Sequence, residues 1–505
     1  MRAATMTSEG SSAPLAQSRP ARILTWRSGF WLAFVIPMSG LTLVGYEIGA
    51  IGAYGALAVW VGTSVIALAQ NYIYAELAGM HPEKAGGISL YASHIWSRYF
   101  APLGGIFGWG YWAGWSLTLA VVSLVIGDLV QAQWFPTTTG TVDVFGNHVG
   151  LPTYIAAAII VVVYLINVSG IRPVINTNIV IGAALTLLAG VCVIGPAVLG
   201  DLHAASLTFS AGHGAWTVVV TLVTWSFVAS WTSYGTEIAA TFTPEYRNPK
   251  VDVARALRSS ALLMIVVVAL STTVFPAAVG VHTIATNPIG FFSVLVSRVL
   301  GHSFGGVAIG IVCAAQIIAL GSATSDSGRA LYGMAGDGIT VRQLHKLNRR
   351  GQPMRGMTVD LVFNLAVLFL VSNVAGIIFT SNLGYLISVV FALAGFVLLR
   401  FTEPDAERPV RLRRVWVPIA CLLVAFNVFM IVIGFTHPSL VGYGGGTEQI
   451  ISLSVIVVGL VSYFAARYVQ LGVRGSSLWR HHEPFAAGDV DAEGVPGIAA
   501  APSVR

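Results

Sequence analysis

One carboxylate lies inside a stretch of the chain that is otherwise apolar and long enough to cross a membrane. The stretch reads SFVASWTSYGTEIAAT over residues 226–241, and it places Glu237 beside Gly235 and after a run of serines and threonines. A carboxylate at membrane depth costs about 2.5 to 3.5 kcal/mol, so such groups line a path for solutes or protons or pair with a neighbour. Two interpretations of Glu237 therefore stay open, a solute or proton site and a structural hydrogen bond to another helix.

A second apolar stretch contains an interruption of another chemical kind. Residues 34–49 read FVIPMSGLTLVGYEIG, with Pro37 and the pair Ser39-Gly40 near the middle. Proline removes a backbone donor and glycine permits non-helical dihedral angles, so both residue types open a helix locally. Open backbone inside a membrane is tolerated only where it is buried in protein or lines a cavity. We therefore expect a cavity beside this stretch.

A third polar group, Thr324, Ser325 and Asp326, offers the hard oxygen ligands that suit a sodium ion. A proton site or a hydrogen bond at a helix end explains these residues equally well. The 11 histidines show no clustered ligand spacing apart from His481-His482, so no metal site is expected. The sequence also contains neither an HExxH nor a Gly-x-Ser-x-Gly motif, which argues against an enzyme embedded in the membrane.

The composition is that of an integral membrane protein. Of the 505 residues, 55% are hydrophobic and only 10% are charged, whereas soluble domains carry about 25% charged residues. The net charge is +6, but the basic residues are not gathered in one domain, so nucleic-acid binding is not indicated. The three cysteines lie in apolar runs, so neither a disulfide framework nor a redox role is expected.

Twelve apolar stretches have the length that a helix needs to cross roughly 30 Å of hydrocarbon. Runs such as IAAAIIVVVYLIN lack the alternation of a membrane β-barrel, so each stretch is predicted to be a helix. The stretches are residues 29–50, 54–78, 103–130, 153–169, 174–199, 215–241, 256–281, 303–327, 357–379, 381–400, 415–436 and 448–469.

The distribution of Lys and Arg predicts how these helices are oriented. If the N-terminus lies inside, 26 of the 27 basic residues fall on the inner side. Inner loops are enriched in Lys and Arg, so we expect both termini on the cytoplasmic side of the cell membrane. The exception, Arg298, lies in residues 288–301, which have the pattern of a helix on the membrane surface. Residues 89–100 have the same pattern on the inner side.

The two interruptions fall in the first and sixth stretches, five helices apart. This spacing is typical of inverted-repeat transporters, in which the substrate lies between two broken helices. Free amides of one half-helix would attract an anionic group and free carbonyls of the other an ammonium group, so a zwitterion fits between them. We therefore predict an all-α membrane protein with twelve transmembrane helices, a 5+5 inverted-repeat core with broken helices 1 and 6, and helices 11 and 12 outside it.

The domain boundaries follow from this count. Residues 1–24 and 475–505 are predicted to be disordered cytoplasmic tails around a twelve-helix transporter domain at 25–474. Within that domain the parts are repeat one at about 28–200, repeat two at about 214–400, and helices 11 and 12 at about 415–470.

Four motifs occur in order along the chain: YAELAGMHPEKAGGISLY (74–91), TEIAATFTPEYRNPKVDVARAL (236–257), SDSGRALYGMAGDGI (325–339) and SNLGYLISVVFALAGFVLLR (381–400). Together they resemble the amino acid/polyamine/organocation transporters, and the resemblance covers roughly residues 28–470. It implies a secondary active transporter that moves a small amino acid or related amine by alternating access. A polyamine or organic amine carrier and an exchanger are the alternatives.

The resemblance also implies roles for residues of the sixth stretch. Glu237 falls where a member of the family has a buried glutamate implicated in proton sensing. Trp231 falls on the aromatic residue that covers the substrate from outside. Tyr234 falls on a position that lines the pocket, and its neighbours Ser233 and Gly235 are further candidates.

The first and third stretches supply the remaining implied pocket residues. Ser39, Gly40 and Leu41 fall on the family's Gly-Ser-Gly turn, but Ser39 and Leu41 replace two of its glycines. That departure puts the recognition of an α-carboxylate in doubt. In the third stretch, GYWAGWSLT supplies Gly114 and Thr118 as weaker candidates.

The coupling ion stays open. Some relatives use a lysine of helix five in place of sodium, but residues 174–199 contain no Lys or Arg. Proton coupling through Glu237 is the first expectation, because a buried carboxylate can load and unload a proton as the cavity alternates. Sodium bound at Thr324, Ser325 and Asp326 is the alternative, and no other cofactor is expected.

The expected partners are a small solute and the lipid bilayer, with no nucleic acid. A channel is disfavoured, because pores built as rings need symmetric subunits whereas this chain has internal pseudo-symmetry. The sequence leaves open the identity of the solute, symport or exchange, and the oligomeric state.

Overall fold

The computed structural model describes Arg22 and residues 24–82, 86–169, 174–350, 352–371, 373–442 and 445–479. Most of the predicted tails, 1–24 and 475–505, lie outside these residues. Within the described part, ten helical segments are long and apolar enough to cross a membrane. Residues 183–199 form a shorter apolar helix. The exact count of twelve stays a prediction.

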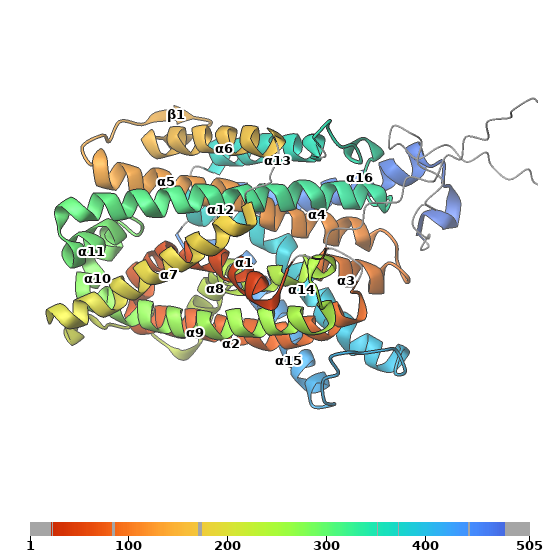
Figure 1. The fold of residues 1–505 in the computed structure, drawn as a ribbon, viewed down its shortest axis with the longest axis horizontal. Helices are drawn as coiled ribbons and strands as arrows, with labels where there is room; N and C mark the ends of the chain where they lie inside the picture. Colours follow the sequence, from red (N-terminus) through yellow and green to blue (C-terminus); the bar gives the residue numbers. More distant parts are fainter. Residues whose placement is uncertain are drawn as a thin grey trace, which may run out of the picture.

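The long helices run side by side along one direction (Figure 1). The α-helices are α1 (Trp26–Ser39), α2 (Val44–Met80), α3 (Gly87–Trp96), α4 (Leu103–Ser116), α5 (Thr118–Trp134), α6 (Leu151–Ser169), α7 (Val174–Leu199), α8 (Ala215–Ser233), α9 (Pro249–Val279), α10 (Val281–Thr286), α11 (Phe291–Leu300), α12 (His302–Gly336), α13 (Met354–Val371), α14 (Val374–Thr402), α15 (Trp416–Thr436) and α16 (Gly446–Phe464). The 3-10 helices are η1 (Gly40–Leu43), η2 (Ala204–Ser206), η3 (Tyr234–Ala240), η4 (Thr243–Glu245), η5 (Arg342–Leu344), η6 (Pro438–Leu440) and η8 (Gly475–Trp479), and η7 (Ala465–Gln470) is a π-helix.

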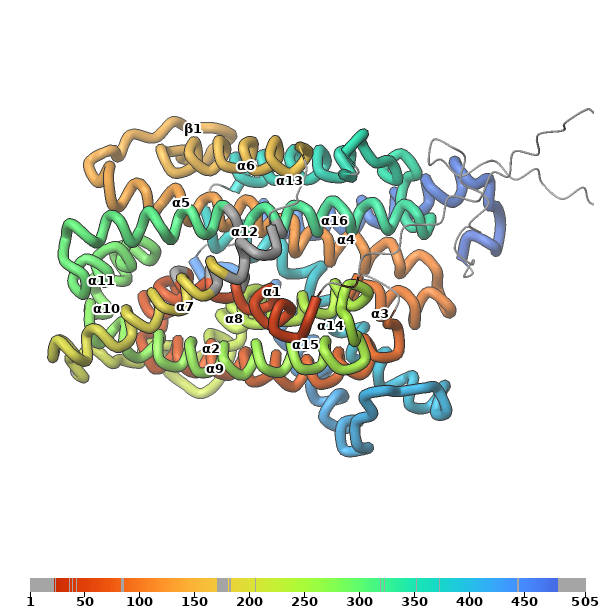
Figure 2. Tube along the Cα trace, in the orientation of Figure 1, coloured from red at the N-terminus to blue at the C-terminus, as the bar shows by residue number. Residues whose placement is uncertain are grey.

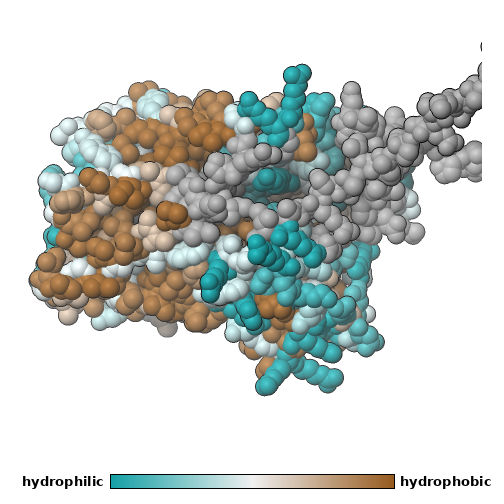
Figure 3. All heavy atoms as spheres, in the orientation of Figure 1, coloured by the Kyte–Doolittle hydropathy of each residue, from teal (hydrophilic) through white to brown (hydrophobic). Residues whose placement is uncertain are grey.

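The two ends of the helix bundle differ in composition. One end, at the right of Figure 1, carries α3 and the segment 403–415 after α14. Because this segment contains four arginines, we call this end the basic end. The opposite end carries α10 and α11. In Figure 3, hydrophobic residues cover the left and middle of the visible face, and hydrophilic residues gather toward the basic end. This arrangement fits an apolar belt within a membrane and a polar end in water.

The first predicted span is interrupted near its middle. It consists of α1, the 3-10 turn η1 and the start of α2, which continues as far as Met80. Gly52 then breaks α2 with φ 77° and ψ 172°, where the first and second predicted spans meet. A side chain at Gly52 would meet the carbonyl oxygen of Thr208 at 2.5 Å, so both the dihedral angles and the space favour glycine.

The sixth predicted span is interrupted in the same way, because α8 passes into the 3-10 helix η3. In Figure 2, α1 lies close to α9. It also contacts η3, although α1 is far from both elements in sequence. Gly40 and Tyr234 keep right-handed helical dihedral angles. The prediction of unwound backbone with free peptide ends is therefore wrong. A 3-10 turn keeps its amides bonded, which avoids unpaired donors in apolar surroundings.

Two other predicted boundaries differ from the structure. The ninth span ends at Val371 and the tenth begins at Val374, whereas the predictions were 357–379 and 381–400. The side chain of Asn373 accepts a hydrogen bond from the backbone amide of Gly376 at 2.6 Å. This N-cap starts α14 directly after the polar pair Ser372-Asn373, seven residues before its predicted beginning.

The segments between the spans contain both expected and unexpected structure. Residues 89–100, predicted to be a surface helix, overlap α3, which begins two residues earlier, and residues 288–301, predicted likewise, contain α11. A two-stranded antiparallel hairpin, β1 (Val142–Val144) and β2 (Asn147–Val149), was not predicted. Residues 475–479, predicted to belong to the tail, form η8, and Trp479 stacks on Phe100.

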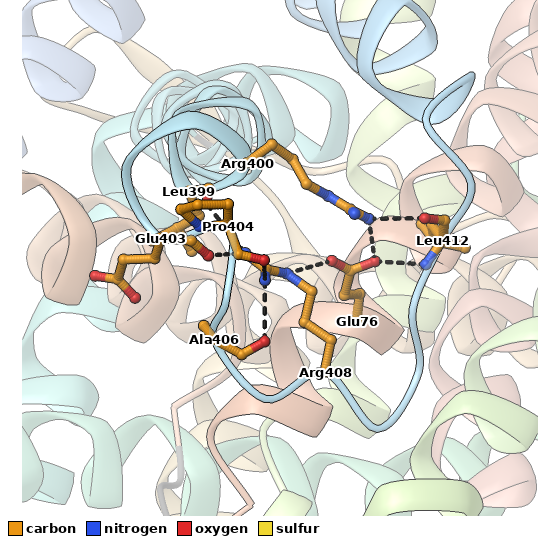
Figure 4. Close-up of polar contacts among 8 residues, drawn as sticks. All are labelled: Glu76, Leu399, Arg400, Glu403, Pro404, Ala406, Arg408 and Leu412. Carbon is orange, nitrogen blue, oxygen red and sulfur yellow. Dashed lines mark hydrogen bonds and ion pairs between the residues drawn. The ribbon is translucent and has the colours of Figure 1, made fainter.

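Three charged residues connect α2 and α14 to the segment 403–415 at the basic end (Figure 4). Glu76 forms ion pairs with Arg400 and with Arg408, and it also accepts the backbone amide of Leu412 at 2.7 Å. Arg408 in turn donates to the carbonyl oxygens of four residues, namely Leu399, Glu403, Pro404 and Ala406. Glu76 therefore has a structural role, as its position near a helix end suggests.

Candidate functional site

Glu237 lies in η3 and is held by two donors from one helix. Its Oε1 accepts hydrogen bonds from the hydroxyl of Tyr111 at 3.0 Å and from the indole N–H of Trp115 at 3.1 Å. Its side chain is buried, and Oε2 has no hydrogen-bond partner among the described residues. Both donors are neutral, so among the described residues no cation is hydrogen-bonded to this carboxylate. A carboxylate in such a setting is suited to binding and releasing a proton.

The spacing on α4 explains why both donors reach the same oxygen. Tyr111 and Trp115 are four residues apart, so they lie on one face of the helix. The hydroxyl of Tyr111 also lies 3.2 Å from the hydroxyl of Thr241. Tyr385 of α14 completes an aromatic wall, with ring centroids 6.0 Å from Tyr111 and 6.2 Å from Trp115.

A cavity of about 280 Å³ extends from this wall toward the basic end. Tyr111 and Thr241 line it, so it reaches the groups that surround Glu237. Gly86 and Gly87, with φ 130° and 55°, start α3 at the cavity, and a side chain at Gly87 would meet Thr241 at 2.8 Å. The charged and titratable residues that line the cavity are His94, Glu245, Asp326, Arg329, Asp337 and Arg467.

Glu245 is the cavity residue with the clearest electrostatic perturbation outside the spans. Burial raises the pKa of its carboxyl group, and the positive charge of Arg329 opposes that shift. Asp326 of α12 also faces the cavity and interacts electrostatically with Arg329. The cavity wall thus pairs two acids with one guanidinium group.

The predicted residues of the first span pack directly against the sixth. A side chain at Gly40 would meet Thr232 at 2.4 Å, so α1 and α8 touch at this position. Leu41 is buried. The backbone of Ser39 ends α1, and its side chain lies outside the described part of the structure. Gly235 faces Pro37, which a side chain at Gly235 would meet at 3.4 Å.

Two residues predicted from separate spans are in contact. The indole N–H of Trp231 donates to the backbone carbonyl of Gly114 at 3.0 Å. The hydroxyl of Ser233 donates to the carbonyl of Ala229 within its own helix, and its predicted role in binding stays a prediction. The sixth and third spans are therefore fixed to each other beside Glu237.

Tyr234 is the first residue of η3. Its hydroxyl is near Gln70 of α2 and Asn427 of α15, away from the residues that line the cavity. Its predicted role in the pocket stays a prediction, and the structure gives it buried polar neighbours instead.

The third span has an interruption that the sequence did not reveal. α4 ends at Ser116 and α5 begins at Thr118, whose buried hydroxyl has no partner among the described residues. Asn364 of α13 accepts the backbone amide of Ala120 at 2.9 Å and donates to the hydroxyl of Ser116 at 2.9 Å. Asp360 and Asn364 in one apolar helix, four residues apart, were the available signal for this contact.

The possible sodium ligands are only partly assembled. Asp326 faces the cavity, Thr324 is buried, and the hydroxyl of Ser325 is hydrogen-bonded to the guanidinium of Arg329. A guanidinium group at this position competes with a bound cation. Within the described residues no cluster of three or more His, Cys, Asp or Glu side chains has the arrangement of a metal site.

Comparisons with known proteins agree with the helical architecture. Residues 24–461 match the protein family described as Amino acid permease. The chain is 24% identical over 463 residues to the glutamate/serine transporter of Bacillus subtilis, covering 87% of this chain and 81% of that protein. It is 24% identical over 364 residues to the lysine-specific permease of Lactococcus lactis, covering 68% and 67%. It is 26% identical over 350 residues to the cadaverine/lysine antiporter of Escherichia coli, covering 67% and 72%.

Proposed function

Because this chain belongs to the amino acid permease family, we propose that it carries a small amino acid or a related amine across the cytoplasmic membrane by alternating access. It is a multi-pass membrane protein, and its relatives are permeases and transporters rather than enzymes. Both termini lie in the cytoplasm in this proposal. The parts that move are repeat one at about 28–200 and repeat two at about 214–400.

The observation that carries this proposal is the cavity that reaches from the basic end to the groups around Glu237. Its lining includes Tyr111, which donates to Glu237, and Thr241 beside it. Beyond that wall, Gly40 packs against Thr232, and Trp231 bonds to Gly114. Such an arrangement suits a carrier whose path is open on one side only, as alternating access requires.

We assign substrate contacts to the residues around the first, third and sixth spans. They are Ser39, Gly40, Leu41, Gly114, Thr118, Trp231, Ser233, Tyr234 and Gly235. With the amides of η1 and η3 bonded in 3-10 turns, recognition of the substrate falls to side chains and to carbonyl groups with a free lone pair.

Protons are the coupling ion in this proposal, and Glu237 is the group that carries them. Its two neutral donors stabilise either protonation state without fixing a charge, since neither is a cation. Sodium coupling at Thr324, Ser325 and Asp326 is the alternative, and the bond between Ser325 and Arg329 weighs against it.

A carrier or exchanger of organic amines is the second candidate function. The acids Glu245, Asp326 and Asp337 on the cavity wall favour a cationic solute. The resemblance to a cadaverine/lysine antiporter points the same way. Arg329 and Arg467 on the same wall offset part of that preference.

Uptake into proteoliposomes tests the proposal. Radiolabelled glutamate, serine, lysine and cadaverine are offered with and without an inward proton gradient, and with choline in place of sodium. We expect saturable uptake of at least one of them that depends on the proton gradient. Loss of uptake on removal of sodium, with no effect of the gradient, would replace proton coupling by sodium coupling.

The variant Glu237→Gln isolates the proposed proton carrier. We expect it to abolish the dependence of uptake on pH while exchange of internal for external substrate continues, since the amide cannot release a proton. The matched control is Asp128→Asn, a carboxylate of α5 that does not line the cavity. An unchanged pH profile in Glu237→Gln removes this residue from the coupling mechanism.

A further inference from the structure

A second buried carboxylate lies in α13, away from Glu237. Asp360 is fully buried, with 0% of its surface exposed. Its Oδ2 accepts a hydrogen bond from the hydroxyl of Ser327 at 2.9 Å, and the hydroxyl of Ser116 is also a neighbour. Its Oδ1 has no hydrogen-bond partner among the described residues.

Among the residues that the structure describes, no cation forms an ion pair with Asp360. Its hydrogen-bond partners in the described part of the chain are hydroxyl groups. Among the packed elements, α4 and α6 contain no charged or titratable Asp, Glu, His, Lys or Arg side chain. The Asp, Glu, His, Lys and Arg side chains on the other elements packed against α13, and on α13 itself besides Asp360, are Asp128, His148, His302, Asp326, Arg329, Arg342, Arg355 and Arg400; the titratable Cys313, Tyr332 and Tyr385 are neutral at pH 7. The one that acts on Asp360 electrostatically is Asp326, which is itself an acid.

An ionised Asp360 would thus be a buried charge without a counter-ion and with another acid nearby. An unpaired charge within a membrane protein is costly, and the cost is removed when the carboxylate takes up a proton. In the neutral form, one oxygen still accepts the bond from Ser327 and the other can carry the hydrogen. The geometry therefore favours an acid that holds a proton.

The position of Asp360 connects it to the cavity and to the third span. Ser327 follows Asp326, which lines the cavity, so the donor to Asp360 is one residue from the cavity wall. One turn further along α13, Asn364 bonds the backbone at the interruption between α4 and α5. Trp231 bonds to Gly114 just before that interruption.

We propose that Asp360 is a second proton-binding site of this transporter, reached from the cavity along the turn of α12 that contains Ser327. Release of its proton leaves a charge beside Ser327 and one turn from Asn364, and this changes the packing of α13 against the interrupted third span. The role in transport rests on the proposed proton-coupled function, whereas the presence of the proton does not.

Infrared spectroscopy of the purified protein tests the proton itself. A protonated carboxyl group absorbs at a higher frequency than a carboxylate, and the band shifts in deuterium oxide. We expect such a band at neutral pH in the wild type, in Glu237→Gln and in Asp128→Asn, and its loss in Asp360→Asn. Spectra of the wild type and Asp360→Asn that coincide in this region overturn the proposal.

A second variant covers the case in which Asp360→Asn does not fold. Ser327→Ala removes the hydroxyl that bonds to Oδ2 and leaves the carboxyl group in place. We expect the carboxyl band to move to a higher frequency, because the group loses a hydrogen bond. A band that stays at the same frequency in Ser327→Ala contradicts the assignment to Asp360.

Transport measurements then separate this inference from the proposed function. With lysine as the probe, we expect Asp360→Asn to lose part of the gradient dependence of uptake and to keep lysine/lysine exchange. If the wild type moves none of lysine, serine, glutamate and cadaverine, the proposed function fails while the infrared result still stands. A full gradient dependence in Asp360→Asn removes Asp360 from coupling.

Discussion

Glu237 lies behind Tyr111 of the cavity wall, whereas Glu245 lines the cavity, and the two acids differ in their partners. Glu237 is held by neutral donors on α4, whereas Glu245 lies at the basic end within the field of Arg329. Glu245, Arg329 and Tyr111 line the same cavity, so a solute on the proposed path meets both charges and the aromatic wall. The cavity wall therefore favours an amine near Glu245 and a carboxylate near Arg329.

The raised pKa of Glu245 predicts how the stability of the protein depends on pH. A carboxyl group whose pKa is higher in the folded than in the unfolded state stabilises the fold at low pH, and this contribution is lost as the pH rises through the folded pKa. The variant Glu245→Gln has no ionisable group at this position, so its stability does not fall in this way as the pH rises. We expect its melting temperature relative to the wild type to increase between pH 4 and pH 8, measured by thermal unfolding in detergent.

A difference in melting temperature that does not change with pH would contradict this prediction. Glu407→Gln serves as the control, because Glu407 is exposed and the bonded amino group of Lys250 lowers its pKa. Because the pKa of Glu407 is lowered, its carboxylate stabilises the fold more as the pH rises. Any change in the melting temperature of Glu407→Gln relative to the wild type is therefore a decrease between pH 4 and pH 8.

The functional residues that could be predicted from the sequence are polar or charged residues within apolar stretches. Glu237 is an acid in an apolar stretch, and the structure places it beside a cavity wall. Asp360 satisfies the same criterion within α13, but no second interruption or motif accompanied it, and it was missed. The contact between Trp231 and Gly114 depends on how two helices meet, which a single sequence does not specify.

At the level of elements, three spans change helix geometry near Glu237. The first and sixth contain 3-10 turns, and the third has an interruption between α4 and α5. At each interruption the backbone amides are hydrogen-bonded, either within the 3-10 turn itself or to a side chain such as that of Asn364. Glycine and proline signalled the first, whereas the third is supported by a residue from another helix and has no local signal. Asn373 starts α14 by a cap at the polar pair Ser372-Asn373, whereas the prediction divided the two spans at residue 380, in the later polar group TSN.

The contact between α4 and α14 depends on a pair of glycines. A side chain at Gly110 would meet the backbone of Gly384 at 2.7 to 2.9 Å, so the two helices touch directly. Small residues permit such close approach between membrane helices. We expect Gly110→Ala to destabilise the protein by about 1 to 3 kcal/mol, since an overpacked contact must open. It should also reduce uptake, because Tyr111 moves with α4.

Gly62→Ala is the matched control for this prediction. Gly62 lies within α2, and nothing lies within 4 Å of a side chain added there. Alanine favours a helix over glycine by about 1 kcal/mol, so this variant should be neutral or more stable. Thermal unfolding in detergent compares the two, and equal melting temperatures would show that α4 and α14 separate without cost.

At the scale of the whole molecule, the two ends of the bundle are closed by different means. At the opposite end, Arg298 donates to the carbonyl of Ala278, which joins α11 to the end of α9. At the basic end, Glu76 joins α2, α14 and the segment 403–415. A carrier that alternates must keep some contacts between its helices while others open. The buried position of Glu76 makes it a candidate for a contact that is kept.

Replacing Glu76 tests whether this contact holds the basic end together. In Glu76→Gln, the guanidinium groups of Arg400 and Arg408 lose their carboxylate while they stay largely buried. Removal of one partner of a buried ion pair typically costs about 3 to 5 kcal/mol, so we expect a clear fall in melting temperature. The segment 403–415 should also become more sensitive to proteases, because Leu412 loses a charged acceptor.

The exposed pair of Lys250 and Glu407 separates this effect from the general loss of a charge at the basic end. Glu407→Gln removes the same kind of group from the same segment, and exposed pairs contribute little to stability. We therefore expect proteolysis of residues 403–415 to accelerate in Glu76→Gln and to stay at the wild-type rate in Glu407→Gln. If the two variants are cut equally fast, the segment is held by its own arginine-to-carbonyl bonds, and Glu76 does not connect the helices. If Glu76→Gln alone is cut faster and uptake also falls, the carboxylate holds α2 against α14 during transport.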